Sequence, residues 1–320
     1  MEVKINKLSD INNIDFLVDN SLNGTAFAYE FFLKLKKVKK LLCVYDNKKL
    51  VAFFPLFEKN KSLEQSTMYI PYGGPVLLFN FSSNRKKLLY TREVLNKMLK
   101  YLKKYYNSIS FSFDPYIKDI ISCVKNGFVP EVRYTYKINL SDSLDSIFSS
   151  FCRDRKRDIK STSEINIKSG DISLYDFQES LKWEYNYGPK TSEKFVKKYI
   201  EKAIKNKKGE CFIAVYKNKV IGGICVVWDK INCYIMYSYY DKNYVSPIPK
   251  VYFELIKYLK KNNICKYLDF EGSVFQEIEN WNLSFGSYQE LYFNFYYEKN
   301  KKHSLYEELY DYGDKNEKFY

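Results

Sequence analysis

Two stretches of the chain share one pattern of apolar and polar positions. LLCVYDNKKLVAFFPLF, residues 41–57, and CFIAVYKNKVIGGICVV, residues 211–227, each contain two apolar runs on either side of a short turn with Asn and Lys. Apolar runs that flank such a turn are typical of β-hairpins. We therefore predict one hairpin in each half of the chain.

The two halves are also alike further along. LKYLKKYYNSISFSFDP, residues 99–115, aligns without a gap with IKYLKKNNICKYLDFEG, residues 256–272, at an offset of 157 positions. In both segments an amphipathic helix pattern leads into a short apolar strand that ends in an acid. The alignment places four residues in two opposed pairs, Ser112 with Asp269 and Asp114 with Glu271.

A looser correspondence joins residues 126–140 to residues 284–298, where a turn precedes an alternating strand. Two copies of hairpin, helix, strand, turn and strand predict an α/β (α+β) chain of two similar domains with mixed central sheets. We place an N-terminal domain at 1–139, a C-terminal domain at 140–300 and a charged tail at 301–320. The alternative is that two lysine-rich α/β units are alike by chance.

Residues 141–160 are predicted to form one helix, capped by Ser141 or Ser143, that carries half of the six arginines of the chain. One face of this helix gathers four basic residues, Arg153, Lys156, Arg157 and Lys160. Arg155 projects into the apolar face. The forked guanidinium suits bidentate contacts with phosphate or carboxylate. The helix is therefore either an anion-binding element or a solvated face offset by Asp154 and Asp158, with Arg155 paired to a structural carboxylate.

Composition restricts the chemistry. The formal net charge of +14 favours an anionic partner. The codon usage of an AT-rich genome, which raises the lysine content, explains the same excess of positive charge. The single histidine, His303, lies in the tail, which nearly excludes Ser-His-Asp triads, Cys-His pairs and histidine-ligated metals. The seven cysteines have no CxxC spacing, so neither a disulfide framework nor a metal site is indicated.

The pattern of apolar residues also bears on location. The sequence has no run of 18 or more apolar residues, and its start lacks the pattern of a signal peptide. We expect a cytoplasmic protein. A peripheral position at the inner face of the membrane is the alternative.

Several segments, in their order and spacing, resemble the FemAB type of the GNAT acyltransferase superfamily, in which two GNAT-like domains are joined. The resemblance covers most of residues 20–297 and is carried by YIPYGGPVLL, FSFDPYI, RDRKRDIK, IPKVYFELIKYLKK, KYLDFEGS and WNLSFGS. It implies an enzyme that attaches an amino acid or acyl group to an amine, commonly on a peptidoglycan or other envelope precursor. Aminoacyl-tRNA is the donor in the FemAB branch, whereas ordinary GNAT enzymes use acyl-CoA.

The sequence departs from both branches. Trp281 and Asn282 stand where the aminoacyl branch has Phe-Lys, and the helical arm of that branch is missing. The CoA-binding loop of GNAT domains is rich in glycine, but YYDKNYVSPIPKVYFE contains none, and Pro247 and Pro249 each remove a backbone donor. We expect no tightly bound cofactor, and the co-substrate stays open between acyl-CoA and aminoacyl-tRNA.

Acyl transfer to an amine requires a group that takes up a proton. Asp114 is one candidate because it ends a strand and matches the Asp-Pro position of the family; alternatively, it caps the following turn. Asp269 and Glu271 alternate along LDFEGS and are expected on one side of the sheet, where neighbouring carboxylates raise one pKa. The alternative for this pair is a solvated sheet edge.

The remaining candidates are basic and aromatic residues that would contact substrate: Arg153, Arg157, Lys160, Tyr72, Trp183, Tyr187, Lys190, Tyr237 and Tyr239. With 32 tyrosines in the chain, any single one is more often a packing residue. The expected partner is an anionic small molecule or nucleotide sugar. Transfer RNA and a lipid-linked precursor at the membrane surface are alternatives, and DNA is not expected.

Three functions are consistent with these features. The first is an N-acyltransferase that acts on a cell-envelope glycan or peptidoglycan precursor. The second is an acyl-CoA-dependent N-acetyltransferase of an amino sugar in surface polysaccharide. The third is a non-catalytic RNA-binding module that would bind tRNA in a salt-dependent way.

Overall fold

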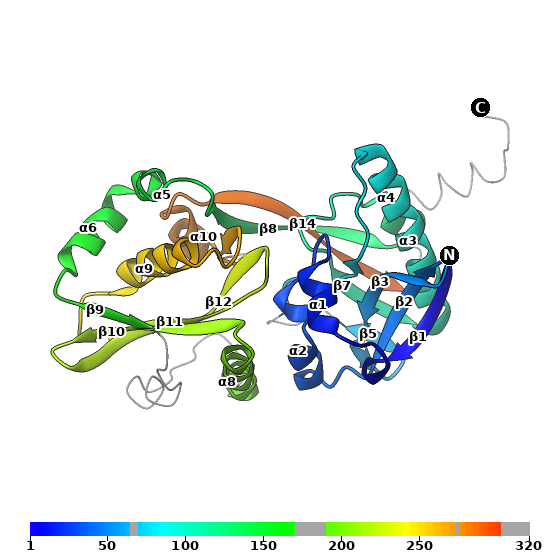
Figure 1. Cartoon of the computed structure of the whole chain (residues 1–320), viewed down its shortest axis with the longest axis horizontal. Coiled ribbons are helices and arrows are strands. Elements are labelled where there is room, and N and C mark those ends of the chain that lie inside the picture. The colour runs from blue at the N-terminus through cyan, green and yellow to red at the C-terminus, as the bar shows by residue number, and fades with distance from the viewer. Residues whose placement is uncertain (65–69, 170–189, 273–274, 302–320) are drawn as a thin grey trace. The chain divides into compact units, whose positions relative to one another are not determined.

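The computed structural model describes residues 1–64, 70–169, 190–272 and 275–301 (Figure 1). The chain divides into two compact units. Unit 1 comprises Met1–Arg133 together with the chain from Leu291 onward, and unit 2 comprises Tyr134–Glu290. No helix in these ranges is long and apolar enough to cross a bilayer.

Unit 1 contains two groups of paired strands. The first has the order β1-β2-β3-β6, with β1 (Glu2–Lys7), β2 (Lys40–Asp46), β3 (Lys49–Pro55) and β6 (Val76–Leu77). The second has the order β4-β5-β7-β14, with β4 (Glu58–Lys59), β5 (Ser62–Glu64), β7 (Ser108–Ser112) and β14 (Tyr288–Glu298). The helices of this unit are α1 (Ile14–Asp19), α2 (Glu30–Leu35), α3 (Asn84–Tyr105) and α4 (Ile121–Lys125).

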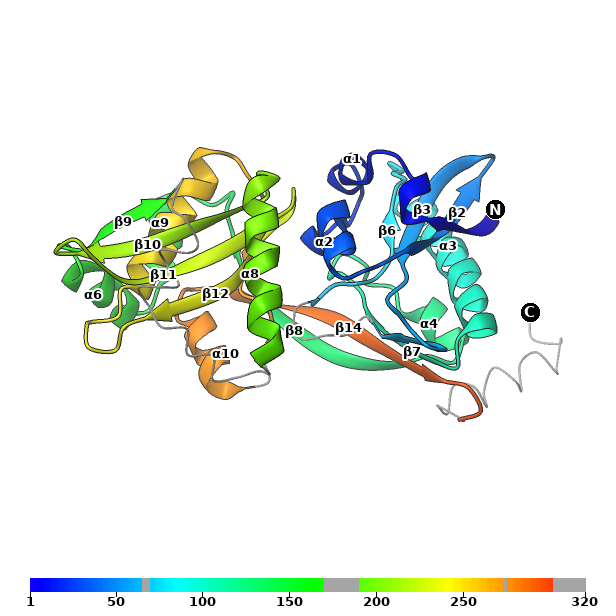
Figure 2. The same ribbon diagram turned by 90° about the horizontal axis from the view of Figure 1, so that it is seen from below.

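Unit 2 contains a mixed sheet of order β8-β13-β12-β11-β10-β9. Its strands are β8 (Val129–Asn139), β9 (Asn166–Ser169), β10 (Gly209–Tyr216), β11 (Lys219–Trp228), β12 (Asn232–Tyr240) and β13 (Tyr267–Asp269). Its helices are α5 (Leu144–Ser150), α6 (Arg153–Ser161), α8 (Lys190–Lys205), α9 (Ile248–Lys261) and α10 (Gln276–Leu283). Helices α8 and α9 cover opposite faces of this sheet (Figures 1 and 2).

Both predicted hairpins are confirmed. β2 pairs with β3 and β10 pairs with β11, in each case through a two-residue turn. The turn residues Asn47 and Lys48 have φ of 47° and 65°, and Lys217 and Asn218 have φ of 46° and 62°. Positive φ at both central residues is the type I′ geometry that matches the twist of the strands.

The helices form because their apolar residues lie on one side. In α9 the buried positions include Val251, Leu255 and Leu259, and in α3 they include Val94 and Met98. This spacing puts the apolar side chains on the face that meets the sheet. The helix-then-strand order predicted in both halves is confirmed, since α3 leads to β7 and α9 leads to β13.

The last strand of each half belongs partly to the other unit. In unit 2, the end of β8 pairs with β13, with Asn139 opposite Tyr267 and Lys137 opposite Asp269. In unit 1, β14 pairs with β7, with Asn294 opposite Ser112. The observed division at 133/134 and at 290/291 therefore differs from the predicted domains 1–139 and 140–300, because each of these 11-residue strands spans two units.

The single helix predicted for residues 141–160 is wrong, because the chain is extended at Phe151 and Cys152 between α5 and α6. Phe151 is buried and packs edge-to-face on Phe285 at 5.3 Å between ring centroids. The backbone N–H of Cys152 donates to the carbonyl of Ser284 instead of continuing the helix. Ser143 is the cap of α5, since its hydroxyl accepts from the N–H of Ser146.

Candidate functional site

The strongest candidate site lies at the end of β13 in unit 2. β12 and β13 run parallel and pair over only three positions, the last being Tyr234 opposite Asp269. β13 then ends, while β12 continues to Tyr240. Ligands of open α/β sheets commonly bind beyond the carboxyl ends of parallel strands. The residues after Asp269 therefore occupy a favourable place for chemistry.

Asp269 is completely buried and holds the turn that follows β13. Its Oδ1 accepts hydrogen bonds from the hydroxyl of Thr135 and, at 2.8 Å, from the backbone N–H of Glu271. Its Oδ2 lies 3.8 Å from Nζ of Lys137, which also pairs with Glu290 at 3.1 Å. With these partners, Asp269 is placed to position Glu271.

Glu271 has several unusual properties. Its backbone is left-handed, with φ of 60°, which is uncommon for a non-glycine residue. The residue is half-buried, but its Oε1 is fully covered and has no hydrogen-bond partner among the described residues. Burial, and secondly the charge of Asp269, raises the pKa of Glu271 to about 8. Such a carboxyl exchanges a proton near neutral pH, as a general base must.

The predicted alternation of Asp269 and Glu271 along one strand is wrong, because β13 ends at Asp269 and Glu271 turns out of the extended conformation. The predicted direction of the pKa shift agrees with the structure. Its main cause is burial of the carboxyl, however, and the neighbouring charge comes second.

Two buried residues of unit 2, Tyr199 near Glu271 and Asp229 near Tyr199, were not identified from the sequence. Tyr199 on α8 is fully buried, and its pKa is raised by burial and by the charges of Asp229 and Glu271. Asp229 is also buried and anchors the β11–β12 turn by accepting from the N–H groups of Ile231 and Asn232 at 2.6 and 2.8 Å. A helical tyrosine and a turn acid are common patterns, so neither stands out before the fold brings Tyr199 near both Glu271 and Asp229.

The arginines of α6 have two different environments. Arg155 is packed: its guanidinium lies 4.5 Å from the ring centroid of Trp281 and pairs with Asp158 at 3.1 Å. Arg157 pairs with Asp154 at the same distance but is exposed. These pairs match the structural alternative for Arg155 and Arg157. Arg153 and Lys160 are exposed, and anion binding by this face stays a prediction.

The two predicted site residues of unit 1, Asp114 and Tyr72, make contacts within the fold. Asp114 is buried after β7, and its Oδ1 accepts from the N–H of Tyr116 at 2.8 Å, as in an acid that caps a turn. Tyr72 is 2% exposed and packs edge-to-face on Tyr292 at 5.2 Å. Asp114 and Glu271 belong to different units.

Three further residues that are predicted to contact substrate lie on β12 and α8 of unit 2. Tyr237 is buried and Tyr239 is half-buried, both on β12. α8 begins at Lys190. Trp183 and Tyr187 lie outside the described residues.

A cavity of about 350 Å³ lies in unit 2 between the end of α6 and the residues before α9. Polar groups and two aromatic rings contribute to its lining, namely Ser161, Ser163, Glu164, Tyr216, Asn243 and Tyr244. The rings of Tyr216 and Tyr244 meet edge-to-face at 6.2 Å. This lining suits a sugar ring or a nucleoside, which offer both apolar faces and polar edges.

The start of α9 is poorly equipped to hold a pyrophosphate. Pro247 is the N-cap residue and Pro249 lies in the first turn, so two backbone donors are missing. The ammonium of Lys250 is already bonded to the carbonyls of Thr162 and Ile165 at 2.9 and 2.7 Å. In the ranges that the structure covers, no group of three or more His, Cys, Asp or Glu side chains could hold a metal ion.

No family model and no curated protein matches this sequence. Among solved structures, that of FemX aligns with a TM-score of 0.64 at 12% identity and covers 98% of this chain and 99% of that chain. An acetyltransferase of the GNAT family from Colwellia psychrerythraea aligns with a TM-score of 0.53 at 13% identity, over 93% of this chain and all of that one.

A further match is the C-terminal domain of a putative lysylphosphatidylglycerol synthetase from Agrobacterium fabrum. It has a TM-score of 0.52 at 8% identity and covers 80% of this chain and 84% of that chain. The mixed α/β fold of this chain is therefore the fold of FemX and of GNAT acetyltransferases, which confirms the resemblance at the level of fold.

Proposed function

We propose that the chain is an N-acyltransferase that moves an acyl or aminoacyl group onto an amine of a cell-envelope glycan or peptidoglycan precursor. The observation that carries the proposal is Glu271, a half-buried carboxyl with a raised pKa at the end of a parallel strand. The fold shared with FemX and with the lysylphosphatidylglycerol synthetase domain supports this class of reaction.

In this mechanism the carboxylate of Glu271 accepts a proton from the acceptor amine as its nitrogen attacks the donor carbonyl. A bond forms between that nitrogen and the carbonyl carbon, and the bond from this carbon to the oxygen or sulfur of the donor breaks. The leaving oxygen or sulfur takes up the proton that Glu271 accepted, which returns the carboxyl to its ionised form. Asp269 acts through the backbone N–H of Glu271 and is a positioning residue.

Separate features of unit 2 bear on the donor and on the acceptor. The prolines at the start of α9 weigh against a CoA pyrophosphate bound there in the usual way, and so favour an aminoacyl donor such as aminoacyl-tRNA. The cavity beside α6 has two tyrosines that suit the sugar or nucleoside part of a nucleotide-sugar or glycan acceptor, although Glu271 is not among its lining residues. Acetyl-CoA with an amino-sugar acceptor is the competing pair.

A product assay tests the proposal. The full chain is incubated with acetyl-CoA or with a mixture of charged tRNAs, together with amino sugars and nucleotide-linked muropeptides, and products are detected by mass spectrometry. We expect an acylated amine with one donor, and a loss of at least about 100-fold in the Glu271→Gln variant. The matched control Glu277→Gln changes an exposed glutamate of the same unit and should keep full activity.

Two results would count against the proposal. The first is full activity in Glu271→Gln. The second is tRNA binding without product from any donor and acceptor pair, which is the behaviour of the RNA-binding alternative.

A further inference from the structure

Helix α3 in unit 1 concentrates positive charge on one side. Its 22 residues contain eight Lys and Arg residues and one acid, Glu93, which gives a net charge of seven, half of the formal +14 of the chain. At 100° per residue, six of these cations and Glu93 fall within an arc of about 120° that faces away from the buried side. One of the six, Lys103, is half-buried and donates to the carbonyl of Asn126. The other five are exposed. We call this set the basic face: Arg85, Lys86, Lys97, Lys100 and Lys104.

Apart from Glu93, which lies within the same arc, the described chain does not neutralise the basic face. All five side chains belong to exposed residues, and none has an ion pair with a described residue. Other cations of α3 are engaged, as Arg92 is with Asp119 at 2.6 Å. Arg85 and Lys86 also lie in the first turn, where the helix dipole favours acids instead. Uncompensated charge of this density favours an anionic partner.

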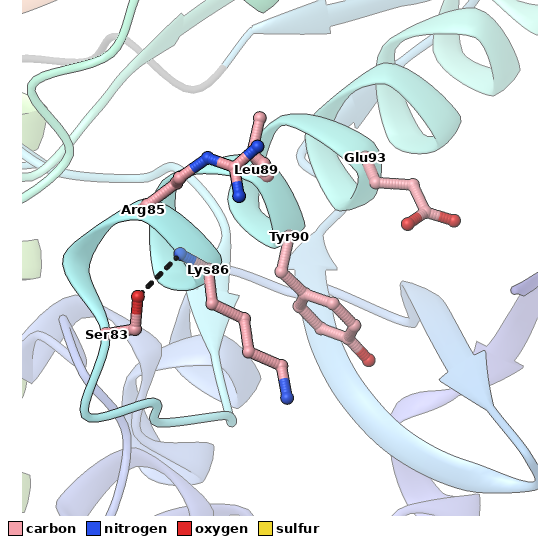
Figure 3. Close-up of a pocket in the computed structure, with 6 residues that line it drawn as sticks. All are labelled: Ser83, Arg85, Lys86, Leu89, Tyr90 and Glu93. Atoms are coloured by element: carbon pink, nitrogen blue, oxygen red, sulfur yellow. Dashed lines mark hydrogen bonds between the residues drawn. The ribbon is translucent and has the colours of Figure 1, made fainter.

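Apolar residues accompany the basic face at its N-terminal end. Leu88 and Leu89 are 40% and 49% exposed. A cavity of about 360 Å³ opens beside Leu89, as Figure 3 shows, and is lined by Ser83, Arg85, Lys86, Leu89, Tyr90 and Glu93. Leucine enters the boundary between lipid headgroups and acyl chains, whereas single-stranded nucleic acid is bound by aromatic stacking. These leucines therefore favour a lipid surface over RNA.

We propose that the basic face of α3 docks on the headgroups of an anionic phospholipid bilayer, with Leu88 and Leu89 entering the interface. The cations extend along the helix for roughly 29 Å, a length that suits a flat charged surface. Membrane docking does not depend on the proposed transfer reaction. If that reaction takes place, docking would bring the enzyme to an acceptor carried on a lipid.

Vesicle sedimentation tests the inference with the full chain. We expect co-sedimentation with vesicles that contain phosphatidylglycerol, none with phosphatidylcholine alone, and release by high salt. Lys97→Glu/Lys100→Glu/Lys104→Glu should weaken binding by about 100-fold, since each basic residue near the surface contributes roughly fivefold. Lys198→Glu/Lys202→Glu/Lys205→Glu on α8 makes the same change of charge at exposed positions of unit 2 and should leave binding unchanged.

The double variant Leu88→Ser/Leu89→Ser should bind vesicles more weakly and leave any tRNA binding unaltered. Circular dichroism verifies that each variant is folded. If the change from lysine to glutamate disturbs the helix, the same lysines are changed to glutamine instead. The inference is overturned if both triple variants lose binding equally, if neutral vesicles bind as well, or if the chain binds tRNA through α3 and ignores vesicles. A soluble acceptor in the product assay keeps the transfer reaction separate from these outcomes.

Discussion

At the residue scale, Glu271 combines two features that each oppose stability. A left-handed backbone is unfavourable for a residue with a side chain, and burial of a carboxyl disfavours its charged form. The hydrogen bond from its N–H to Asp269 holds the backbone in place. Features of this kind persist at functional sites, where the surrounding structure maintains them.

The raised pKa predicts the pH dependence of the reaction. A general base must be ionised, so kcat/KM should rise with pH and level off above about 8, the pKa of Glu271. Glu271→Asp should keep a rising profile with lower activity. Measurement of initial rates between pH 6 and 9.5, roughly spanning this pKa, tests the assignment. A flat profile would show that another group accepts the proton.

The same carboxyl should make the fold less stable at high pH. Its pKa is raised from 4.5 to about 8 on folding, so the folded state holds a proton that the unfolded chain releases. Stability contributed by the protonated form is therefore complete below pH 4.5 and is lost as pH rises towards 8. Glu271→Gln should raise the free energy of unfolding by about 2 to 4 kcal/mol at pH 8.5 and change it little at pH 4.

Urea unfolding at the two pH values measures this difference. If Glu271 is required for catalysis at the expense of stability, its Gln variant should be both more stable and inactive. Equal stability of the two proteins at pH 8.5 would contradict the raised pKa.

Two substitutions of Asp114 distinguish a role in capping the turn from a role in the reaction. Asparagine retains the oxygen that accepts from the N–H of Tyr116, whereas alanine does not. We expect Asp114→Ala to lose about 1 kcal/mol of unfolding free energy and Asp114→Asn to lose less than half of that. If Asp114→Asn is stable but forms no product, the carboxylate itself takes part in the reaction.

At the element scale, α6 offers two arginines that differ in packing alone. Arg155 and Arg157 each pair with an aspartate at 3.1 Å, but their side chains are 18% and 70% exposed. Lysine cannot reproduce the planar contact with Trp281. Arg155→Lys should lower the free energy of unfolding by about 1 to 2 kcal/mol, and Arg157→Lys by less than about 0.5 kcal/mol. Equal losses would mean that the stacking contributes nothing.

The elements that could be predicted are those set by local pattern. The hairpin turns follow from residues that tolerate positive φ between apolar runs, and α9 follows from its helical period. The break at Phe151 could not be predicted, because the local sequence is compatible with a helix. It depends on the contact of Phe151 with Phe285, which is more than 130 residues away in sequence.

The candidate site likewise combines residues that the local sequence reveals with residues that only the fold brings together. Asp269 and Glu271 were found because the internal alignment set them opposite Ser112 and Asp114, and an acid after a strand is visible in sequence. The proximity of Tyr199 to Glu271 arises only when α8 packs on the sheet. Contacts between residues that are distant in sequence cannot be predicted from the local pattern of residues.

At the scale of the whole molecule, the partition of β8 and β14 between units decides what can fold alone. Thr135 and Lys137 of β8 supply two of the partners of the buried carboxylate of Asp269. A boundary at 139/140 would remove both partners from unit 2. A buried carboxylate that loses its partners destabilises a fold by roughly 3 to 5 kcal/mol, which is a large share of the stability of a small domain.

We therefore predict that a fragment of residues 134–290 folds on its own and that a fragment of residues 140–300 does not. The first fragment contains every strand of the unit 2 sheet, including the part of β8 that pairs with β13. The second lacks this strand and gains residues of β14, whose two neighbours in the strand order, β7 and β8, are both missing from the fragment. Thermal unfolding followed by circular dichroism should show a cooperative transition for 134–290 alone. Equally cooperative melting of both fragments would show that β8 is dispensable to unit 2 and that Asp269 finds other partners.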